Sequence, residues 1–424
     1  MHVATNGERF GHIVVIPSCG EGAGLWQSVA SIPTGPVGPV LSVVVINARE
    51  DSPESVRRAN AESLRVLAAE RGAPEHELAG GAAFYRNGPG KLLVVDRTEA
   101  TNPLPPKQGV GLARKIGADI ALACIALGRV RSRWIHCTDA DVRLPLDYFE
   151  QTDRVEARSD DVSAWIYRFR HRLEGSTRQR RAVADYEASL RYYVLGLHFA
   201  NSPYAFHTIG STLAIRAHAY AQVRGFPRRN AAEDFYLLNK LAKVGSIRAL
   251  DGDAIELSGR VSDRVPFGTG RAIGRALAGE DSATLKTYDP RVFDHLRGWI
   301  HALDSLADSG PSGDPLELLE REATRAIATS SDLDPRRLLS ALQASGSLQI
   351  AVHAASHSPF GGRRRDLHEA FDGFRTLKLI HALRDGGIPN LRLDEALRRA
   401  AFIDDADFAR GSHRLAESHR FPPG

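Results

Sequence analysis

HIVVIPSCGEG, at residues 12–22, joins an apolar, β-branched run to a glycine-rich loop, and this pattern recurs along the first third of the chain. Three more apolar runs follow, separated by helix-like stretches at 53–71 and 111–127: LSVVVIN (41–47), KLLVVD (91–96) and WIHC (134–137). Near-continuous apolar strands that alternate with helices predict βαβ units and a mostly parallel sheet covered on both faces. Because ligands bind such sheets at the carboxyl ends of the strands, the segments that follow these runs are expected to form one functional edge.

The pattern changes further along the chain. DVSAWIYRF, at 161–169, predicts another strand, and residues 182–198 carry the apolar periodicity of a helix. We interpret the aromatic stripe of this helix as core or interface packing rather than as a platform for a substrate. From about residue 281 the segments show helical periodicity without strand runs, which predicts a helical C-terminal part.

The composition is that of a globular protein, with 43% hydrophobic and 25% charged residues among 424. No apolar stretch approaches the roughly 18 residues of a membrane-spanning helix, and no signal-peptide pattern is present, so we expect a cytoplasmic protein. Three widely spaced cysteines exclude a disulfide framework and lack zinc-ligand spacing. The net charge of +4 comes from arginine rather than from the seven lysines, and we expect no nucleic-acid partner.

Two carboxylates one residue apart, Asp139 and Asp141, follow the run at 134–137. Side chains at i and i+2 of an extended segment point the same way, so this DxD pair offers converging oxygen ligands to a hard cation. Mg²⁺ and Mn²⁺ typically use one or two carboxylates and fill their other positions with water and phosphate oxygens. The alternative for such a pair is turn chemistry and backbone capping.

Four segments resemble, in the same order, those of family 2 glycosyltransferases of the GT-A fold: VVIPSCGEG (14–22), GLARKIGAD (111–119), TDAD (138–141), and IGSTLAIRAHAYAQVRGFP (209–227) followed by AAEDFYLLNKL (231–241). The resemblance covers roughly residues 10–265. It implies a GT-A domain over residues 1–280, with a nucleotide-binding half at 11–145 and an acceptor-side half at 146–280. Residues 281–424 would form a helical C-terminal domain or cap.

The resemblance assigns several residues to the nucleotide-diphosphate donor. Pro17 and Glu21 correspond to positions that contact the base and ribose in the family. Asn47 replaces the aspartate with which many members bind the base, and its amide still offers a donor and an acceptor. Arg114 would reach the base or the diphosphate, and the alternative for it is a solvated helix residue.

The metal and the chemistry are assigned to acidic residues. Asp139 would contact the ribose or a metal-bound water, and Asp141 would ligate the Mg²⁺ or Mn²⁺ that bridges the two phosphates. Asp234 is the predicted catalytic base of an inverting transfer, although a helix N-terminus would make it a weaker base. Glu233 belongs to the same catalytic pair, but it follows Asn230 at capping-box spacing, so we expect it to act mainly in capping its own helix.

Residues 256–274 form a glycine- and proline-rich stretch in which Arg260, Arg264 and Arg271 are predicted to clamp the diphosphate or a phosphorylated acceptor. The histidine that some GT-A enzymes add as a third metal ligand is absent from this stretch. His353 and His357 have the i, i+4 spacing of helical metal ligands, but we interpret them as a surface pair.

The resulting hypothesis is metal-dependent transfer of a sugar from a nucleotide-diphosphate donor to an acceptor hydroxyl, on a small molecule or a lipid-linked acceptor at the inner face of the membrane. One alternative is a nucleotidyltransferase acting on a sugar phosphate. Another is a non-catalytic scaffold that binds nucleotide sugars.

Overall fold

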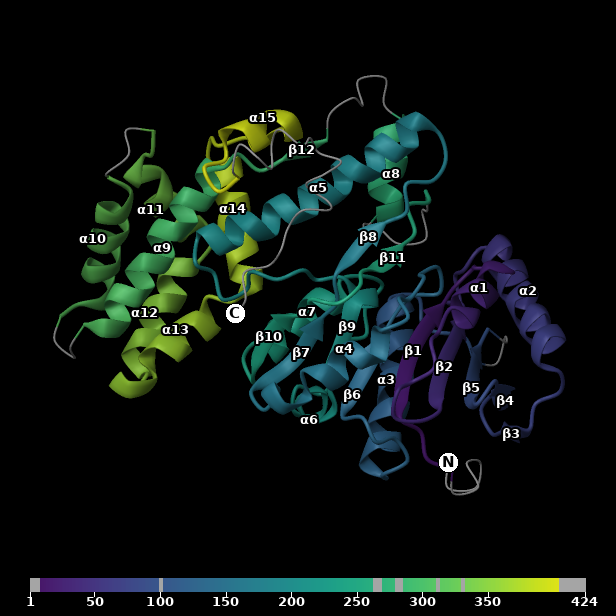
Figure 1. Cartoon of the computed structure of the whole chain (residues 1–424). Coiled ribbons are helices and arrows are strands. Elements are labelled where there is room, and N and C mark those ends of the chain that lie inside the picture. The colour runs from purple at the N-terminus through teal and green to yellow at the C-terminus, as the bar shows by residue number, and fades with distance from the viewer. Residues whose placement is uncertain are drawn as a thin grey trace. The chain divides into compact units, whose positions relative to one another are not determined.

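A computed structural model describes residues 8–98, 102–261, 269–278, 285–309, 313–328 and 332–403. The chain divides into two compact units. Of the described residues, the first unit contains those up to Glu174 together with Thr208–Arg271, and the second contains Gly175–His207 and those from Ala272 to Ile403. Each unit has its own set of elements, coloured by position along the chain in Figure 1.

A nine-stranded sheet forms the centre of the first unit within the described residues. In spatial order its strands are β10 (Ser246–Ala249), β7 (Val162–Ile166), β9 (Leu213–Arg216), β6 (Trp134–Cys137), β1 (His12–Ser18), β2 (Val40–Asn47), β5 (Gly90–Arg97), β4 (Ala82–Asn87) and β3 (His76–Leu78). β6, β1, β2 and β5 run parallel, whereas β9 and β4 run antiparallel to both of their neighbours. The sheet is therefore mostly parallel.

Burial explains why the sequences of the central strands are almost continuously apolar. Every residue of β1, β2, β6 and β7 is buried, so both faces of these strands are covered. Helix α3 (Gly109–Ala126) packs on β1 and β2, where a Cβ at Gly117 would lie 2.4 Å from a methyl group of Val15. Glycine thus allows the helix to approach the sheet closely.

The other elements of the first unit flank this sheet (Figure 1). They are α1 (Gly24–Ala30), α2 (Glu54–Arg71), α4 (Tyr148–Arg154), α6 (Ala217–Gln222), α7 (Glu233–Leu241), the short 3-10 helices η1 (Glu156–Arg158) and η2 (Gly210–Thr212), and a parallel strand pair of β8 (Phe169–His171) and β11 (Ile255–Leu257). Helix α8 (Thr269–Ala278) has its first residues in the first unit and the rest in the second.

The second unit is predominantly helical. Its elements are α5 (Thr177–Phe199), α9 (Arg291–Asp308), α10 (Pro315–Ile327), α11 (Pro335–Ala344), α12 (Ser347–His357), η3 (Phe360–Gly362), α13 (Arg363–Ala370), α14 (Gly373–Asp385), α15 (Leu393–Arg399) and the antiparallel pair of β12 (Lys286–Thr287) and β13 (Leu391–Arg392). Three of its helices, α10, α11 and α14, begin at an aspartate whose side chain accepts a backbone N–H, which satisfies one of the donors left open at each helix start.

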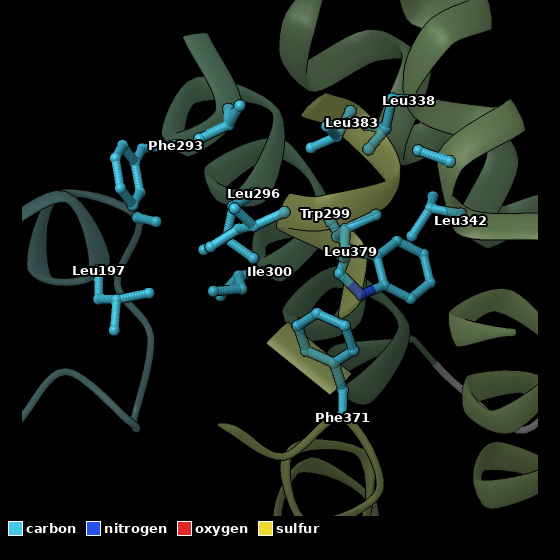
Figure 2. Packing of buried hydrophobic residues seen from close by; sticks show 14 of the residues in the cluster. Leu197, Phe293, Leu296, Trp299, Ile300, Leu338, Leu342, Phe371, Leu379 and Leu383 are labelled. Atoms are coloured by element: carbon cyan, nitrogen blue, oxygen red, sulfur yellow. The ribbon is translucent and has the colours of Figure 1, made fainter. Parts of the chain in front are cut away.

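Trp299 on α9 lies at the centre of the core of the second unit, among Phe371, Leu379 and Leu342 (Figure 2). The rings of Trp299 and Phe371 meet edge to face, with their centroids 5.9 Å apart. Tyr193 on α5 is partly buried and packs against this core. The neighbouring Tyr192 is buried, and its hydroxyl donates to the carbonyl of Tyr288. A helical core of this size accounts for the strand-free periodicity of the sequence.

The expected α/β class is confirmed: a mostly parallel sheet flanked by helices, with helices predominating toward the C-terminus. The strand hairpin of β3 and β4 and the short pair of β8 and β11 were not predicted, because their residues lack a long apolar run. Among the described residues, no helix has the length and apolar character needed to cross a membrane.

Candidate active site

The carboxyl ends of the parallel strands meet at one edge of the sheet, as the sequence predicts. There the side-chain amide of Asn47 donates to the carbonyl of Ser18 over 2.8 Å, which ties the end of β2 to the end of β1. Asn60 on α2 donates to the carbonyl of Asn47 and accepts the N–H of Gly20, over 2.8 Å and 2.7 Å. The amide nitrogen of Asn47 therefore shapes the loop after β1 from a buried position.

The DxD pair lies in the turn that follows β6 rather than in an extended strand. Arg172 donates to the carbonyls of Asp141 and Glu256, both over 3.2 Å, and Arg143 and Glu256 exchange backbone hydrogen bonds of 3.0 Å. The turn is thus fastened to β8 and β11. Asp139 and Asp141 do not lie in the extended segment that the sequence suggested, and each contacts a different arginine.

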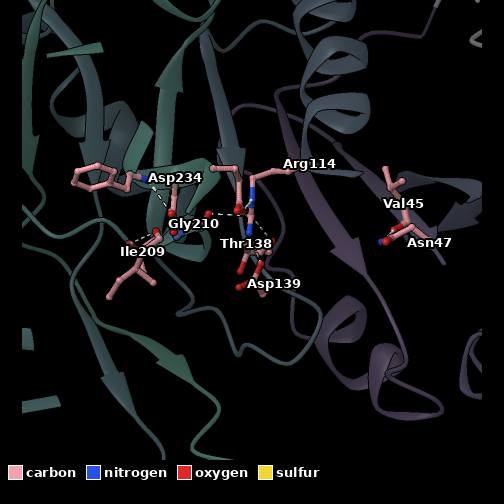
Figure 3. Close-up of polar contacts among 11 residues, drawn as sticks. Val45, Asn47, Arg114, Thr138, Asp139, Ile209, Gly210 and Asp234 are labelled. Atoms are coloured by element: carbon pink, nitrogen blue, oxygen red, sulfur yellow. Dashed lines mark hydrogen bonds and ion pairs between the residues drawn. The ribbon is translucent and has the colours of Figure 1, made fainter. Parts of the chain in front are cut away.

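Asp139 contacts the buried Arg114 of α3 (Figure 3). Nη2 of Arg114 lies 2.8 Å from Oδ1 of Asp139, and Nε lies 3.1 Å from Oε1 of Glu233. Nη1 donates to the carbonyl of Gly210 over 3.0 Å and lies 3.5 Å from that of Thr138. Burial disfavours the charge on Arg114, but the carboxylates of Asp139 and Glu233 outweigh it and raise the pKa of the guanidinium.

Asp141 contacts a second arginine, Arg260, which follows β11. Nη2 of Arg260 lies 2.9 Å from Oδ2 of Asp141, and the same nitrogen contacts Oε2 of Glu21 in the loop after β1. Burial opposes the charge of Arg260, but Asp141 and Glu21 raise its pKa. One cation therefore joins the two carboxylates.

The donor set at this point fits a divalent cation. Carboxylate oxygens of Asp141 and Glu21 converge on a single positive group, and such hard oxygens are the ligands that Mg²⁺ and Mn²⁺ prefer. Across the described residues, no cluster of three or more His, Cys, Asp or Glu side chains is arranged to hold a metal. Phosphate oxygens and water would have to supply the remaining ligands.

Asp234 stands in the first turn of α7, and both of its oxygens accept backbone N–H groups: Oδ2 from Gly210 over 2.8 Å and Oδ1 from Phe235 over 2.7 Å (Figure 3). Burial and the neighbouring carboxylate of Glu233 raise the pKa of Asp234 to about 7, against the opposing effects of Arg114 and the two N–H donors. The backbone N–H groups at the helix start lower the pKa of Asp234, as expected of a helix N-terminus, but burial outweighs them.

Helix α7 does not have the expected capping arrangement. It begins at Glu233, and its N-cap residue, Ala232, has a left-handed φ of 61° and no capping side chain. Asn230 instead accepts the N–H of Gly109 over 2.8 Å, at the start of α3, and donates to the carbonyl of Pro106. Glu233 is buried against Arg114. A left-handed non-glycine residue directly before the acidic pair is a local strain that functional sites often retain.

The remaining predicted residues are placed as follows. Pro17 is buried in β1, paired with Val45 of β2, and Arg271 is exposed on α8 rather than on a loop. Arg264 lies outside the described residues. His353 and His357 are exposed on α12, with their ring centroids 4.2 Å apart and the rings tilted by 37°, as expected for a surface pair.

Gly210, Arg172 and Asn60 contribute to this geometry but were not singled out from the sequence. A Cβ at Gly210 would lie 2.7 Å from Nη2 of Arg114, so glycine is needed for the contact. The glycine within IGST was the available signal for Gly210. For Arg172 and Asn60 the sequence carries no signal, because their partners are backbone carbonyls of distant segments.

No protein-family model and no curated protein sequence matches this chain. Among solved structures, residues 1–349 of TarS from S. aureus in complex with UDP-GlcNAc align with 11% identity and a TM-score of 0.40, covering 84% of this chain and 90% of that one. The mannosyltransferase PcManGT from Pyrobaculum calidifontis, in complex with GDP-Man and Mn²⁺, aligns with 17% identity and a TM-score of 0.33, covering 90% and 88%. Similarities at this level of identity and TM-score support no conclusion about activity. A proposal about activity has to rest on the residues described above.

Proposed function

We propose that the protein is a metal-dependent glycosyltransferase of the family 2 type, which moves a sugar from a nucleotide-diphosphate donor to an acceptor hydroxyl with inversion. The observation that carries the proposal is the position of Asp234 in the first turn of α7, where it is partly buried beside Glu233 and both of its oxygens accept backbone N–H groups, an environment that raises its pKa to about 7. A general base works best when its pKa lies near the operating pH. Asp234 shares the first unit with the DxD turn and with the loop after β1.

In the proposed reaction Asp234 accepts the proton of the acceptor hydroxyl while that oxygen attacks the anomeric carbon of the donor sugar. The bond between the anomeric carbon and the diphosphate oxygen breaks, and the nucleoside diphosphate leaves. Asp141, together with Asp139, would hold Mg²⁺ or Mn²⁺, which when bound supplies positive charge for the leaving diphosphate. Three arginines would add cationic contacts to the phosphates: Arg260, Arg264 and Arg271. The base and ribose would contact Glu21, Pro17 and Asn47.

A thermal-shift titration with UDP, GDP and their sugar conjugates, with and without Mn²⁺, tests this proposal. We expect a nucleoside diphosphate to raise the melting temperature only when Mn²⁺ is present, and Asp141→Asn to abolish this rise. Asp161→Asn is the matched control. Asp161 lies directly before β7, is exposed, and pairs with Arg248 of β10. Absence of binding by every nucleoside diphosphate under both conditions would refute the proposal.

A second assay separates catalysis from binding. Asp234→Asn should lower the rate of sugar transfer or donor hydrolysis by about 10²- to 10⁴-fold while leaving nucleotide binding intact, since a general base contributes that much. If the wild type binds the donor but catalyses neither transfer nor hydrolysis, the protein is a nucleotide-sugar-binding scaffold. Release of pyrophosphate from a nucleoside triphosphate and a sugar phosphate would instead indicate a nucleotidyltransferase.

A further inference from the structure

The guanidinium of Arg114 donates to four oxygens of the protein in the described structure. The partners lie on three separate segments: the turn after β6, the short 3-10 helix η2 and the start of α7. The arginine is only 2% exposed. A contact with a nucleotide would require it to leave the half-exposed Asp139 and the buried Glu233, and isolating the buried charge of Glu233 is strongly unfavourable.

Gly210 connects Arg114 to the proposed base. Its carbonyl accepts from Nη1 of Arg114 over 3.0 Å, and its N–H donates to Oδ2 of Asp234 over 2.8 Å. Figure 3 shows Arg114, Gly210 and Asp234 following one another along this path. Movement of the guanidinium would therefore move the group that orients the Asp234 carboxylate.

Arg114 also contacts Glu233, the carboxylate next to Asp234 in sequence. The charged groups that act on Asp234 are Glu233, on its own helix, and Arg114, on α3. Two adjacent, partly or fully buried carboxylates disfavour each other's ionisation, and a cation against one of them relieves that repulsion. Arg114 thus acts on Asp234 through geometry and through charge.

We propose that Arg114 is a positioning residue, which fixes Asp234 through Gly210 and Glu233 and makes no contact with the donor. It replaces the nucleotide contact expected from the family resemblance. The inference rests on the proposed function, because it takes Asp234 as the base. The contact with Asp139 joins the same arginine to the DxD turn, so one buried cation aligns the donor-side and acceptor-side motifs.

Arg114→Lys and Arg114→Gln test the inference in the full chain, with Arg86→Lys as the control. Lysine keeps the charge but loses the Nε donor and the planar fork, whereas glutamine loses the charge. Arg86 lies on β4, is largely exposed and pairs with Glu75. The measurements are UDP and GDP affinity in Mn²⁺, the transfer rate from pH 5 to 9, and titration of the Asp234 carboxyl by ¹³C NMR, assigned with Asp234→Asn.

We expect nucleotide affinity to change by less than about threefold in Arg114→Lys, while kcat falls by about tenfold or more, as misplacement of a catalytic group produces. In Arg114→Gln the titration midpoint of Asp234 should rise by about one pH unit. If the glutamine variant does not fold, the affinity and rate of Arg114→Lys decide. A tenfold loss of nucleotide affinity with an unchanged kcat would overturn the inference.

The titration separates failure of this inference from failure of the proposed function. If the wild type neither binds a nucleotide nor transfers sugar, the proposed function is wrong, whereas the response of the Asp234 carboxyl to Arg114→Lys and Arg114→Gln still reports the positioning. An unchanged Asp234 titration in both variants would overturn the positioning role, whatever the enzyme catalyses.

Discussion

Arg114 and Glu233 form a buried ion pair across 119 residues of sequence, with Nε of the arginine 3.1 Å from Oε1 of the glutamate. Their side chains are only 3% and 5% exposed. The pair fastens α3 to the start of α7 and sets the environment of Asp234. Four predictions follow from this environment and from the second arginine bridge, between Asp141 and Glu21.

Glu233→Gln should lower the pKa of Asp234, and with it the pH at which the transfer rate is half-maximal. The carboxylate of Glu233 is one of the two main causes that raise the pKa of Asp234, so removing its charge makes Asp234 easier to ionise. The transfer rate measured from pH 5 to 9 should reach half its plateau at a lower pH than in the wild type. Because Arg114→Gln is expected to shift the midpoint upward, shifts of the same sign in both variants would contradict the electrostatic account.

Folding stability should depend on the ionisation of Asp234. Its pKa of about 7 lies above the 3.8 of an unstructured aspartate, so between these values the folded protein holds a proton that the unfolded chain has released. The contribution of this group is fully present below pH 3.8 and is lost as the pH rises through about 7. Asp234→Asn removes this loss, so its melting temperature relative to the wild type should increase from pH 4 to pH 7. A difference that is constant or decreases over that range would contradict the assignment.

Removing Arg260 should strengthen binding of Mn²⁺ in the absence of nucleotide. Its guanidinium contacts both Asp141 and Glu21, so a divalent cation has to compete with it for the same carboxylates. We expect Arg260→Gln to bind Mn²⁺ about tenfold more tightly than the wild type by electron paramagnetic resonance, an effect of about 1.4 kcal/mol. Arg260→Gln combined with Asp141→Asn should lose this gain. Weaker Mn²⁺ binding in Arg260→Gln alone would argue against the competition.

Gly210→Ala should impair both the fold and the reaction. The added methyl group would lie 2.7 Å from Nη2 and 2.9 Å from Cζ of Arg114, which is held by two carboxylates and has little room to withdraw. Overpacking of this kind typically costs about 1–3 kcal/mol of unfolding free energy. Gly361→Ala is the control, since a Cβ there meets nothing within 4 Å. Equal stability and activity of the two variants would show that the contact around Arg114 is not tight.

Several elements could be predicted because their signals are local. The helix expected at 53–71 is α2 (Glu54–Arg71), and the apolar runs at 12–18, 41–47 and 91–96 lie within β1, β2 and β5. Burial on both faces favours an apolar residue at every position of such a strand, so the pattern can be recognised from a short stretch of sequence. Short elements such as β8 and β11 have no recognisable apolar pattern, since three residues cannot establish a periodicity.

The site shows the same division. The segments carrying Asp139, Asp141 and Asp234 were recognisable from residue type and order, because paired acids after a strand and at a helix start are themselves chemical signals. Their partners were not recognisable. Asn230 caps α3 from 121 residues away, and Arg260 contacts Glu21 across 239 residues. Such contacts depend on which segments the folded sheet brings together.

The amino-acid pattern alone therefore determined the α/β class and the chemical types gathered at the carboxyl ends of the strands, since apolar periodicity and residue type are properties of short segments. Only the tertiary structure decided that Arg114 lies buried between Asp139 and Glu233 and that burial raises the pKa of Asp234 to about 7. Desolvation and long-range ion pairing arise when distant segments exclude water together, and no short stretch of sequence encodes them.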